Sequence, residues 1–368
     1  MSFHLPAYTP PDFSRSVFRA APTVTFKPVE QSGVAPDDYH GTSIYPEYFQ
    51  IRTNEWRLLT ESRMDCVVVL NPDETLQATE FRRLKKGDRV ACGRRENAED
   101  GIFVHVNAFS STDRTDDKFV FRSQRTRETS FSIDYDELYG LLNHEHRHGF
   151  IVWVLGPATA FDHDSRLAFT ALIERGYVHT LLAGNALATH DVEGALFGTA
   201  LGQEIYSKRS VHLGHYKHLD AINAIRSAGS IASGVSRGVV REGIMHAAIQ
   251  KGIPFVLAGS IRDDGPLPEV ISDVYRAQDE MRALTRRATT VIALATQLHA
   301  IATGNLLPCY TVKEGRVRPV YFYMVDMSEY AVSKLSDRGS LTARSILTNV
   351  QDFVVTVERG LRERQKTC

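Results

Sequence analysis

The sequence predicts an α/β protein in which a small β-rich N-terminal domain precedes a parallel-sheet, Rossmann-like domain. Before about residue 130, the apolar runs are short and extended, and polar turns such as NPDET and KKGD separate them. This pattern is typical of a small β-rich domain with few helices. After that point, near-continuous apolar runs alternate with amphipathic segments. The alternation indicates strands that are buried on both faces of a parallel sheet.

The chain of 368 residues is too long for one small core and divides into three parts. Residues 1–21 contain three prolines and little periodicity, which indicates an N-terminal arm. Residues 22–130 form the β-rich domain, and residues 131–368 form the α/β domain. The strand-like runs of the β-rich domain are TVTFKPVE, TSIYPEYFQI, DCVVVLN, DRVACG, GIFVHVNAF and KFVFRS.

The second part contains five strand-like runs with helical segments between them. The helix expected at residues 165–176 ends on a glycine, a common helix stop. Leu219, Ile222 and Ile225 share one face of a further helix, and spacings of four and three predict a long helix that starts at Val270. The expected strands are 150–156, 177–184, 253–259, 289–295 and 320–325.

Composition and charge exclude several classes of protein. Apolar residues make up 43% and charged residues 24%, as in globular proteins. The net charge of −1 gives no electrostatic footprint for nucleic acid or an anionic membrane. No apolar run reaches the ~18 residues of a membrane span, and the N-terminus lacks the pattern of a secretory signal. The four cysteines lie far apart without a CxxC motif, so we expect a reduced, cytoplasmic protein.

The stretch FVLAGSIRDDGPLPEV places charged side chains directly after a strand that is expected to be buried. Arg262, Asp263 and Asp264 follow the apolar run almost directly, and ligands of open parallel sheets bind beyond the carboxyl ends of the strands. The alternative is a charged surface turn, with Pro266 and Pro268 at the start of the next helix. Small and polar residues also follow the other predicted strands, which favours a ligand site: GPAT at 156–159, GNA at 184–186, ATQLH at 295–299, and Asp326.

Asp326 indicates what kind of ligand that site would take. A carboxylate at the end of a strand can accept hydrogen bonds from the diol of a ribose. Alternatively, Asp326 is a carboxylate at the start of a helix capped by Ser328, where it interacts with the helix dipole. The G-x-G-x-x-G fingerprint is absent, because no two glycines are separated by a single residue. Any dinucleotide site must therefore be built differently.

Other motifs give weaker indications. HEHRH, residues 144–148, lacks the spacing of HExxH, so we expect no metal site there or elsewhere. His215 and His218 lie three residues apart, so one can face a site while the other faces solvent. The cysteines have no nucleophile context, and no G-x-S-x-G motif occurs.

Long segments of the chain resemble a known family. AGNALATHDVEGALFGTALG, GHYKHLDAINAIRSAGSI, PFVLAGSIRDDGPLPEV, ALATQLHAIATGNLLP and VDMSEYAVSKLSDRGS are similar to ornithine cyclodeaminases of the archaeal and cyanobacterial type. That type includes the C-terminal part of cyanobacterial arginine dihydrolase/ornithine cyclodeaminase. APDDYHGTSIYPEYFQI and ESRMDCVVVL resemble the conserved region named after lysine-oxoglutarate reductase/saccharopine dehydrogenase. The resemblance covers roughly residues 25 to 360.

This resemblance implies a bound NAD and the conversion of ornithine to proline with loss of ammonia. Three features depart from the family pattern: the N-terminal arm, the long segment CYTVKEGRVRPVYFYMVD, and SQRTRETSF in place of a serine-rich segment. These departures concern the substrate, which we expect to be a small amino acid, more than the cofactor. We also expect a homo-oligomer. The NAD contacts that the resemblance implies are Asn185, Ala186, Asp264, Thr296, Gln297, Leu298, His299, Ala300, Asp326, Thr348 and Asn349.

The chemistry needs groups that hold an amino acid and move protons. Asp263 or Asp264 is a candidate acid/base or an anchor for the substrate ammonium. Arg262 and Arg63 are candidates for the substrate carboxylate, since a guanidinium binds it with two hydrogen bonds. His215 and His299 are alternative proton carriers. Two other functions fit the same pattern: an NAD-dependent amino-acid or opine-type dehydrogenase that releases NADH, and a non-catalytic sensor of nucleotides or amino acids.

Overall fold

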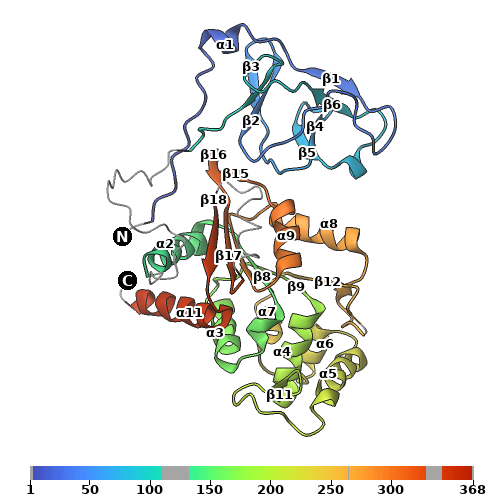
Figure 1. Ribbon diagram of the computed structural model, residues 1–368, viewed down its shortest axis with the longest axis vertical. Helices are drawn as coiled ribbons and strands as arrows, with labels where there is room; N and C mark the ends of the chain where they lie inside the picture. The colour runs from blue at the N-terminus through green and yellow to red at the C-terminus, as the bar shows by residue number, and fades with distance from the viewer. Residues whose placement is uncertain (1–2, 110–131, 264, 329–341, 367–368) are drawn as a thin grey trace.

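The computed structural model describes residues 3–109, 132–263, 265–328 and 342–366 (Figure 1). A β-rich N-terminal part lies at one end of the molecule, and a sheet with helices on its faces forms the other (Figure 1). The predicted fold class is confirmed. Within the described ranges, no helix combines the length and the apolar character that crossing a membrane requires.

The N-terminal part consists of two small antiparallel sheets. One has the strand order β1-β6-β4-β5 and the other the order β3-β2-β7. Phe49, Val68 and Ile102 are fully buried in the core that the strands share. The elements are α1 (Ser16–Arg19), β1 (Thr25–Pro28), β2 (Glu47–Arg52), β3 (Glu55–Leu58), β4 (Val67–Leu70), β5 (Leu76–Thr79), the 3-10 helix η1 (Phe81–Arg83), β6 (Arg89–Cys92) and β7 (Ile102–Val104).

The second part is built on a seven-stranded sheet of order β13-β12-β9-β8-β14-β17-β18, in which every pairing is parallel. The strands are β8 (Ile151–Leu155), β9 (Thr180–Gly184), β12 (Phe255–Ala258), β13 (Val270–Ile271), β14 (Thr290–Leu294), β17 (Tyr321–Asp326) and β18 (Thr342–Leu347). Two hairpins lie outside the sheet: β10 (Thr199–Ala200) with β11 (Gln203–Glu204), and β15 (Tyr310–Lys313) with β16 (Arg316–Pro319).

Helices cover both faces of the sheet, which explains the continuous apolar runs. Ile151, Trp153 and Leu155 of β8 belong to one core, whereas Val152 and Val154 belong to the other. Successive side chains of a strand point to opposite faces, so all five must be apolar. The helices are α2 (Ser132–His148), η2 (Pro157–Ala160), α3 (His163–Glu174), α4 (Asn185–Phe197), α5 (Gly214–Ala228), α6 (Ile231–Ser236), α7 (Ile244–Gln250), α8 (Val274–Thr285), α9 (Gln297–Leu306) and α11 (Val350–Lys366).

The order of the strands reverses at the centre of the sheet. From β8 the chain continues through β9, β12 and β13 toward one edge, and then returns to β14 and continues through β17 and β18 toward the other. The carboxyl ends of the neighbouring strands β8 and β14 therefore mark the topological switch point, where α/β sheets of this kind bind their ligands.

Direct contacts join the two parts of the chain. The amide of Cys309 donates to the carbonyl of Ser62 at 2.9 Å, and Arg286 pairs with Glu61 at 2.9 Å. The N-terminal arm contacts both parts, because the ring of Phe13 stacks on Trp56 and that of Phe3 lies 6.0 Å from that of Tyr321. These contacts give the arm a packing role.

Several predicted elements differ from the structure. Val270, expected in a helix, belongs to the short strand β13, and the helix begins at Val274. The apolar spacing of three and four residues continues within α8, whereas Val270 and Ile271 pair with β12. The prediction missed the strands β3, β5, β10, β11, β13, β15, β16 and β18. The expected strand KFVFRS and the expected helix after Ser328 lie outside the described residues.

Candidate active site at the carboxyl edge of the sheet

The ends of β8 and β14 are pressed together at the switch point. The amide of Gly156 donates to the carbonyl of Leu294 at 2.8 Å. A Cβ added to Gly156 would lie 2.0 Å from the carbonyl oxygen of Ala295. Ala295 has a φ of 46°, in the left-handed region that a residue with a side chain rarely adopts. Backbone strain of this kind is concentrated at functional sites, and sequence patterns gave no sign of it.

His299, in the first turn of α9, lies over the end of a neighbouring strand. A Cβ on Gly184 would come 2.8 Å from the Cε1 atom of His299, and the Nδ1 atom of His299 lies 3.1 Å from the hydroxyl of Thr296. Burial lowers the pKa of His299, while the Asp263 carboxylate opposes this shift and Arg262 adds to it. The ends of β9, β12 and β14 therefore meet at this imidazole, and its lowered pKa favours the neutral form.

The loop after β12 is held in place from two sides. Asp263 Oδ2 accepts a hydrogen bond from the amide of Ser260 at 2.8 Å, while Arg262 is exposed. The amide of Leu267 donates at 3.0 Å to Oδ1 of the buried Asn185, at the start of α4. The predicted cofactor residue Asn185 therefore also anchors the loop that carries Arg262 and Asp263. The remaining member of the motif, Asp264, lies outside the described residues.

The other half of the edge carries Asp326 and the turn after β18. Asp326 Oδ1 accepts from the amide of Ser328 at 2.9 Å, and its carbonyl accepts from the amide of Thr348 at 3.2 Å. Its Oδ2 atom has no hydrogen-bond partner among the residues described. Asn349 Oδ1 accepts from the amide of Gln351 at 2.8 Å at the start of α11. The structure thus brings Asp326, Thr348 and Asn349 together.

The remaining predicted cofactor residues lie at the starts of two helices on the same edge. Ala186 is half-buried in the first turn of α4. In α9, Gln297 and Leu298 are exposed and Ala300 is buried. Exposed and half-buried side chains at this edge can contact a ligand, whereas Ala300 contributes through its packing.

Two predicted site residues lie elsewhere. Arg63 belongs to the N-terminal part, where it donates to Cys66 Sγ at 3.0 Å and pairs with Glu80 at 3.1 Å. It lines a small hollow with Leu306, at the far end of α9 from His299. The ten residues of α9 span about 15 Å. His215 is exposed on α5, and its ring lies 4.3 Å from that of Tyr216.

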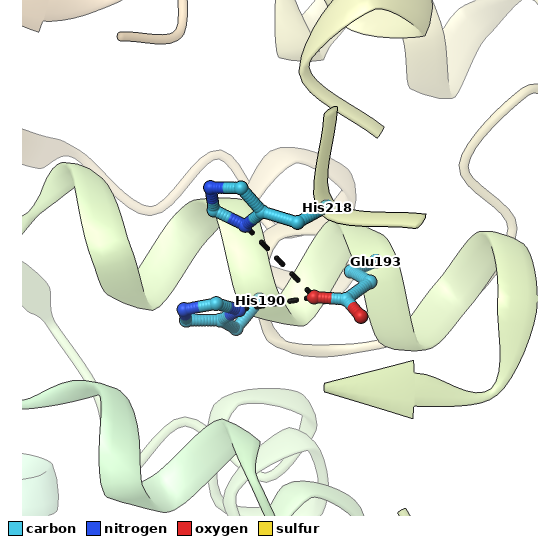
Figure 2. A group of neighbouring side chains, drawn as sticks. All are labelled: His190, Glu193 and His218. Carbon is cyan, nitrogen blue, oxygen red and sulfur yellow. Dashed lines mark hydrogen bonds and ion pairs between the residues drawn. The ribbon is translucent and has the colours of Figure 1, made fainter. Parts of the chain in front are cut away.

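Sequence patterns missed a cluster of metal-ligand side chains, drawn in Figure 2. His190 and Glu193 lie on α4 and are buried, and half-buried His218 lies on α5. Burial alone would raise the pKa of Glu193, but hydrogen bonds from His190, Gly202 and Thr199 outweigh it and lower that pKa. The i, i+3 spacing of His190 and Glu193 was a signal that was available in the sequence.

The histidines of HEHRH lie in the last turns of α2 and serve the packing of the fold. Glu145 is fully buried, where it accepts hydrogen bonds from Thr289 and from Arg318, the latter at 2.7 Å. The rings of His144 and His148 lie 5.1 Å apart. They are not part of a group of three or more potential metal ligands within the described ranges.

A cavity of about 230 Å³ lies close to the His190 cluster. Phe161, which follows η2, lines it, and the Phe161 ring lies 5.0 Å from that of His190. Gln351 also lines the cavity and donates to the carbonyl of Ala158 at 2.9 Å. The cavity therefore borders the loop after β8, at the same edge of the sheet.

Comparisons with known proteins agree with this architecture. Residues 139–357 match the sequence profile of the family described as "Arginine dihydrolase ArgZ-like, C-terminal, Rossmann fold". The ornithine cyclodeaminase of Methanocaldococcus jannaschii is 37% identical over 93% of this chain and 79% of its own. That of Methanothermobacter thermautotrophicus is 39% identical over 87% of this chain and 74% of its own.

Solved structures show the same relationship. A conserved LOR/SDH protein from Methanococcus maripaludis superposes with a TM-score of 0.84 at 35% identity, covering 94% of this chain and 99% of that one. The ternary complex of AgrE with ornithine and NAD⁺ gives a TM-score of 0.58 at 32% identity, and the match covers 95% of this chain but only 47% of AgrE. The chain belongs to the ornithine cyclodeaminase family of the archaeal and ArgZ/AgrE type.

Proposed function

We propose that this protein is an NAD-dependent cyclodeaminase that converts ornithine, or a closely related amino acid, to proline and ammonia. The observation that carries the proposal is the position of His299, a neutral imidazole over Gly184 that faces the loop of Arg262 and Asp263. Support comes from the relatives named ornithine cyclodeaminase and from the AgrE complex with ornithine and NAD⁺.

The residues at the carboxyl edge fit a dinucleotide. The hydroxyl of Thr159, in the turn after β8, is buried without a hydrogen-bond partner in the described part of the chain. Asp326 has one carboxylate oxygen to offer to a ribose, as described above. Thr159 and Asp326 would therefore contribute hydrogen bonds on either side of the switch point. When bound there, NAD supplies a hydride acceptor for Cα of the substrate and returns the hydride later in the same turnover.

The protein's own groups would hold the substrate and move its protons. Arg262 and Asp263 present opposite charges on one loop, which suits the carboxylate and the ammonium of an α-amino acid. Burial lowers the pKa of His299 and so favours the unprotonated imidazole, which can take the proton that the substrate ammonium must lose before Cα can be oxidised. Asp264 remains a prediction for the same role. Arg63 is left out because it lies near Leu306, at the other end of α9 from His299, and His215 because its ring contact is with the neighbouring Tyr216.

An isotope experiment tests the reaction. Purified protein receives ornithine that carries deuterium at C2, and ammonia, NADH and the label are followed together. We expect proline that keeps the deuterium at C2, with ammonia released and no net NADH, because the hydride never meets solvent. His299→Gln should lower turnover by about 10²–10⁴-fold, whereas His212→Gln, at an exposed position before α5, should not.

Each alternative function gives a different result in this experiment. Deuterium in free NADH would identify an amino-acid dehydrogenase. Loss of the label to water would identify a lyase that abstracts a proton, and NAD binding without turnover of any amino acid would identify a sensor. Any of these three results would contradict the proposal.

A further inference from the structure

We propose that His190, Glu193 and His218 form a binding site for one divalent transition-metal ion, such as Zn²⁺, that connects α4 to α5. The site is separate from the residues assigned to the proposed reaction. Figure 2 shows both imidazole rings directed at the same carboxylate oxygen of Glu193. The three side chains come from two helices that pack against each other.

The distances suit a shared ion. His190 Nδ1 lies 3.1 Å from Glu193 Oε2, and His218 Nδ1 lies 4.0 Å from the same atom. All three candidate ligand atoms lie within 4.8 Å of one another. Zinc binds nitrogen and oxygen at about 2.0–2.2 Å in tetrahedral geometry, so neighbouring ligand atoms are separated by roughly 3.3 Å. A small shift of His218, the most exposed of the three, would complete this arrangement.

The carboxylate of Glu193 is held in place by its surroundings. Its Oε1 atom accepts from the Thr199 hydroxyl at 2.9 Å and from the Gly202 amide at 3.2 Å, and its Oε2 atom accepts from the Leu201 amide at 3.2 Å. Hydrogen bonds of this kind orient metal ligands and tune their affinity. Since Oε1 has two donors and Oε2 only one besides His190, Oε2 is the oxygen available to an ion.

His218 provides an independent observation that points to a ligand. Its Nδ1 atom is buried and has no hydrogen-bond partner among the described residues. Buried polar atoms are rarely left in this state, and each such atom needs an explanation. The simpler alternative, a hydrogen bond between His190 and Glu193 with His218 stacked nearby, leaves this nitrogen unsatisfied. An ion would satisfy the nitrogen and the carboxylate together.

The donor set defines the class of ion. Two imidazoles and one carboxylate suit Zn²⁺, Fe²⁺, Co²⁺ or Ni²⁺ better than Mg²⁺ or Ca²⁺, which prefer oxygen ligands. Three protein ligands leave at least one coordination position open. Leu201, whose amide bonds to Glu193, also lines the cavity of about 230 Å³. The ion would therefore lie close to that cavity.

Metal titration of the full-length protein tests the site. After treatment with a chelator and dialysis, ZnCl₂ is added in a calorimeter, and Co²⁺ binding is followed by its visible absorption. We expect one ion per chain for the unmodified protein. His218→Ala should weaken Zn²⁺ binding by at least about a hundredfold, since even residues behind the ligands change metal affinity ten- to a hundredfold. His212→Ala is the control, because His212 is exposed and lies outside the cluster.

Further variants separate ligation from folding. Glu193→Gln keeps one acceptor oxygen, which can serve the Thr199 hydroxyl and the Gly202 amide, but removes the charge and the second oxygen, so it should also lose Zn²⁺ binding. Zn²⁺ should raise the melting temperature of the unmodified protein and of His212→Ala progressively as its concentration increases, but not that of His218→Ala. No binding to the unmodified protein, or equal binding by His218→Ala, would overturn the proposal. A loss of Zn²⁺ binding in His212→Ala would mean that the ion binds at the surface near His212, and this result would also overturn the proposal.

Discussion

The imidazole of His299 occupies the space in which a side chain at Gly184 would begin, with only 2.8 Å between Cε1 and an added Cβ. Gly184 ends β9, and His299 belongs to the first turn of α9. The packing of α9 against the end of β9 therefore requires that residue 184 has no side chain, although the two segments lie more than a hundred residues apart in the sequence. This contact sets the position of the proposed proton acceptor.

Gly184→Ala should displace His299 without unfolding the protein. The backbone of Gly184, with φ −101° and ψ 174°, suits alanine, and the group that must shift is a side chain. We expect turnover of ornithine to fall at least about tenfold, because a small misplacement of a catalytic group is costly, while the melting temperature stays nearly constant. The control is Gly41→Ala, in the N-terminal part, where the new Cβ makes ordinary contact. Unchanged turnover in Gly184→Ala would show that His299 has no role in the reaction.

Gly156→Ala should destabilise the fold itself. Its backbone conformation also suits alanine, but the added Cβ would meet the carbonyl oxygen of Ala295 at 2.0 Å. A backbone atom at the centre of a sheet cannot move aside as an imidazole can, so we expect a loss of about 1–3 kcal/mol in the free energy of unfolding. Urea denaturation measures this value. A normal unfolding curve would mean that the ends of β8 and β14 can separate freely.

Asp326→Ala should weaken NAD binding. Loss of a hydrogen bond to a charged acceptor costs roughly 1.5–3 kcal/mol, or about ten- to a hundredfold in affinity. For the same reason NADP, whose 2′-phosphate would lie beside the carboxylate, should bind poorly to the unmodified protein. Calorimetry with both dinucleotides measures the difference, and Asp352→Ala, at an exposed position in the first turn of α11, serves as the control. If Asp326→Ala bound NAD as tightly as the unmodified protein, Asp326 would not contact the cofactor, and its side chain would serve only to accept the hydrogen bond from the Ser328 amide.

His179 should make the protein less stable in acid. Its Nδ1 atom accepts from the amide of Ile151 at 2.8 Å, which requires an unprotonated nitrogen, and burial lowers its pKa from the ordinary 6.5. The unfolded chain therefore binds more protons below pH 6.5, so the free energy of unfolding falls as the pH drops from about 6.5 through the lowered pKa. His179→Asn keeps an acceptor for Ile151 but cannot titrate.

Urea denaturation at several pH values between 7.5 and 5 checks this prediction. The stability of His179→Asn should decline less steeply over this range than that of the unmodified protein. His163→Asn, at a partly exposed position on α3, should decline like the unmodified protein. If the free energy of unfolding had the same pH dependence in His179→Asn and in the unmodified protein, the protonation of His179 would not affect stability and the prediction would be wrong.

Apolar pattern alone was sufficient to place the central strands of the sheet. β8 and β14 are buried along their whole length, so all their positions except Thr290 are apolar and the runs were visible in the sequence. Because parallel strands end at one edge, the same runs also predicted that residues after them, such as Thr296 and Asp326, would share a site. The absence of G-x-G-x-x-G led to the prediction that any dinucleotide site is built differently, and in the structure the short helix η2 follows β8.

The two strands at the edges of the sheet have weaker apolar patterns in the sequence than the central strands. β18 lies at one edge and contains Arg344, which pairs with Glu137. β13 lies at the other edge and has only two residues. An edge strand has one unpaired side and less burial, so its sequence need not form an apolar run. For this reason β18 was missed and Val270 was assigned to a helix.

Only the tertiary structure decided which polar side chains meet. The spacing of His190 and Glu193 on α4 is local, but His218 joins them because α5 packs on α4. The contacts of His299 with Gly184 and of Gly156 with Ala295 likewise depend on how separate strands and helices approach each other. The sequence by itself determined the central strands and the edge at which the residues that follow them lie, because burial acts on each segment alone. The arrangement of groups at that edge depends on packing between segments, which no local pattern records.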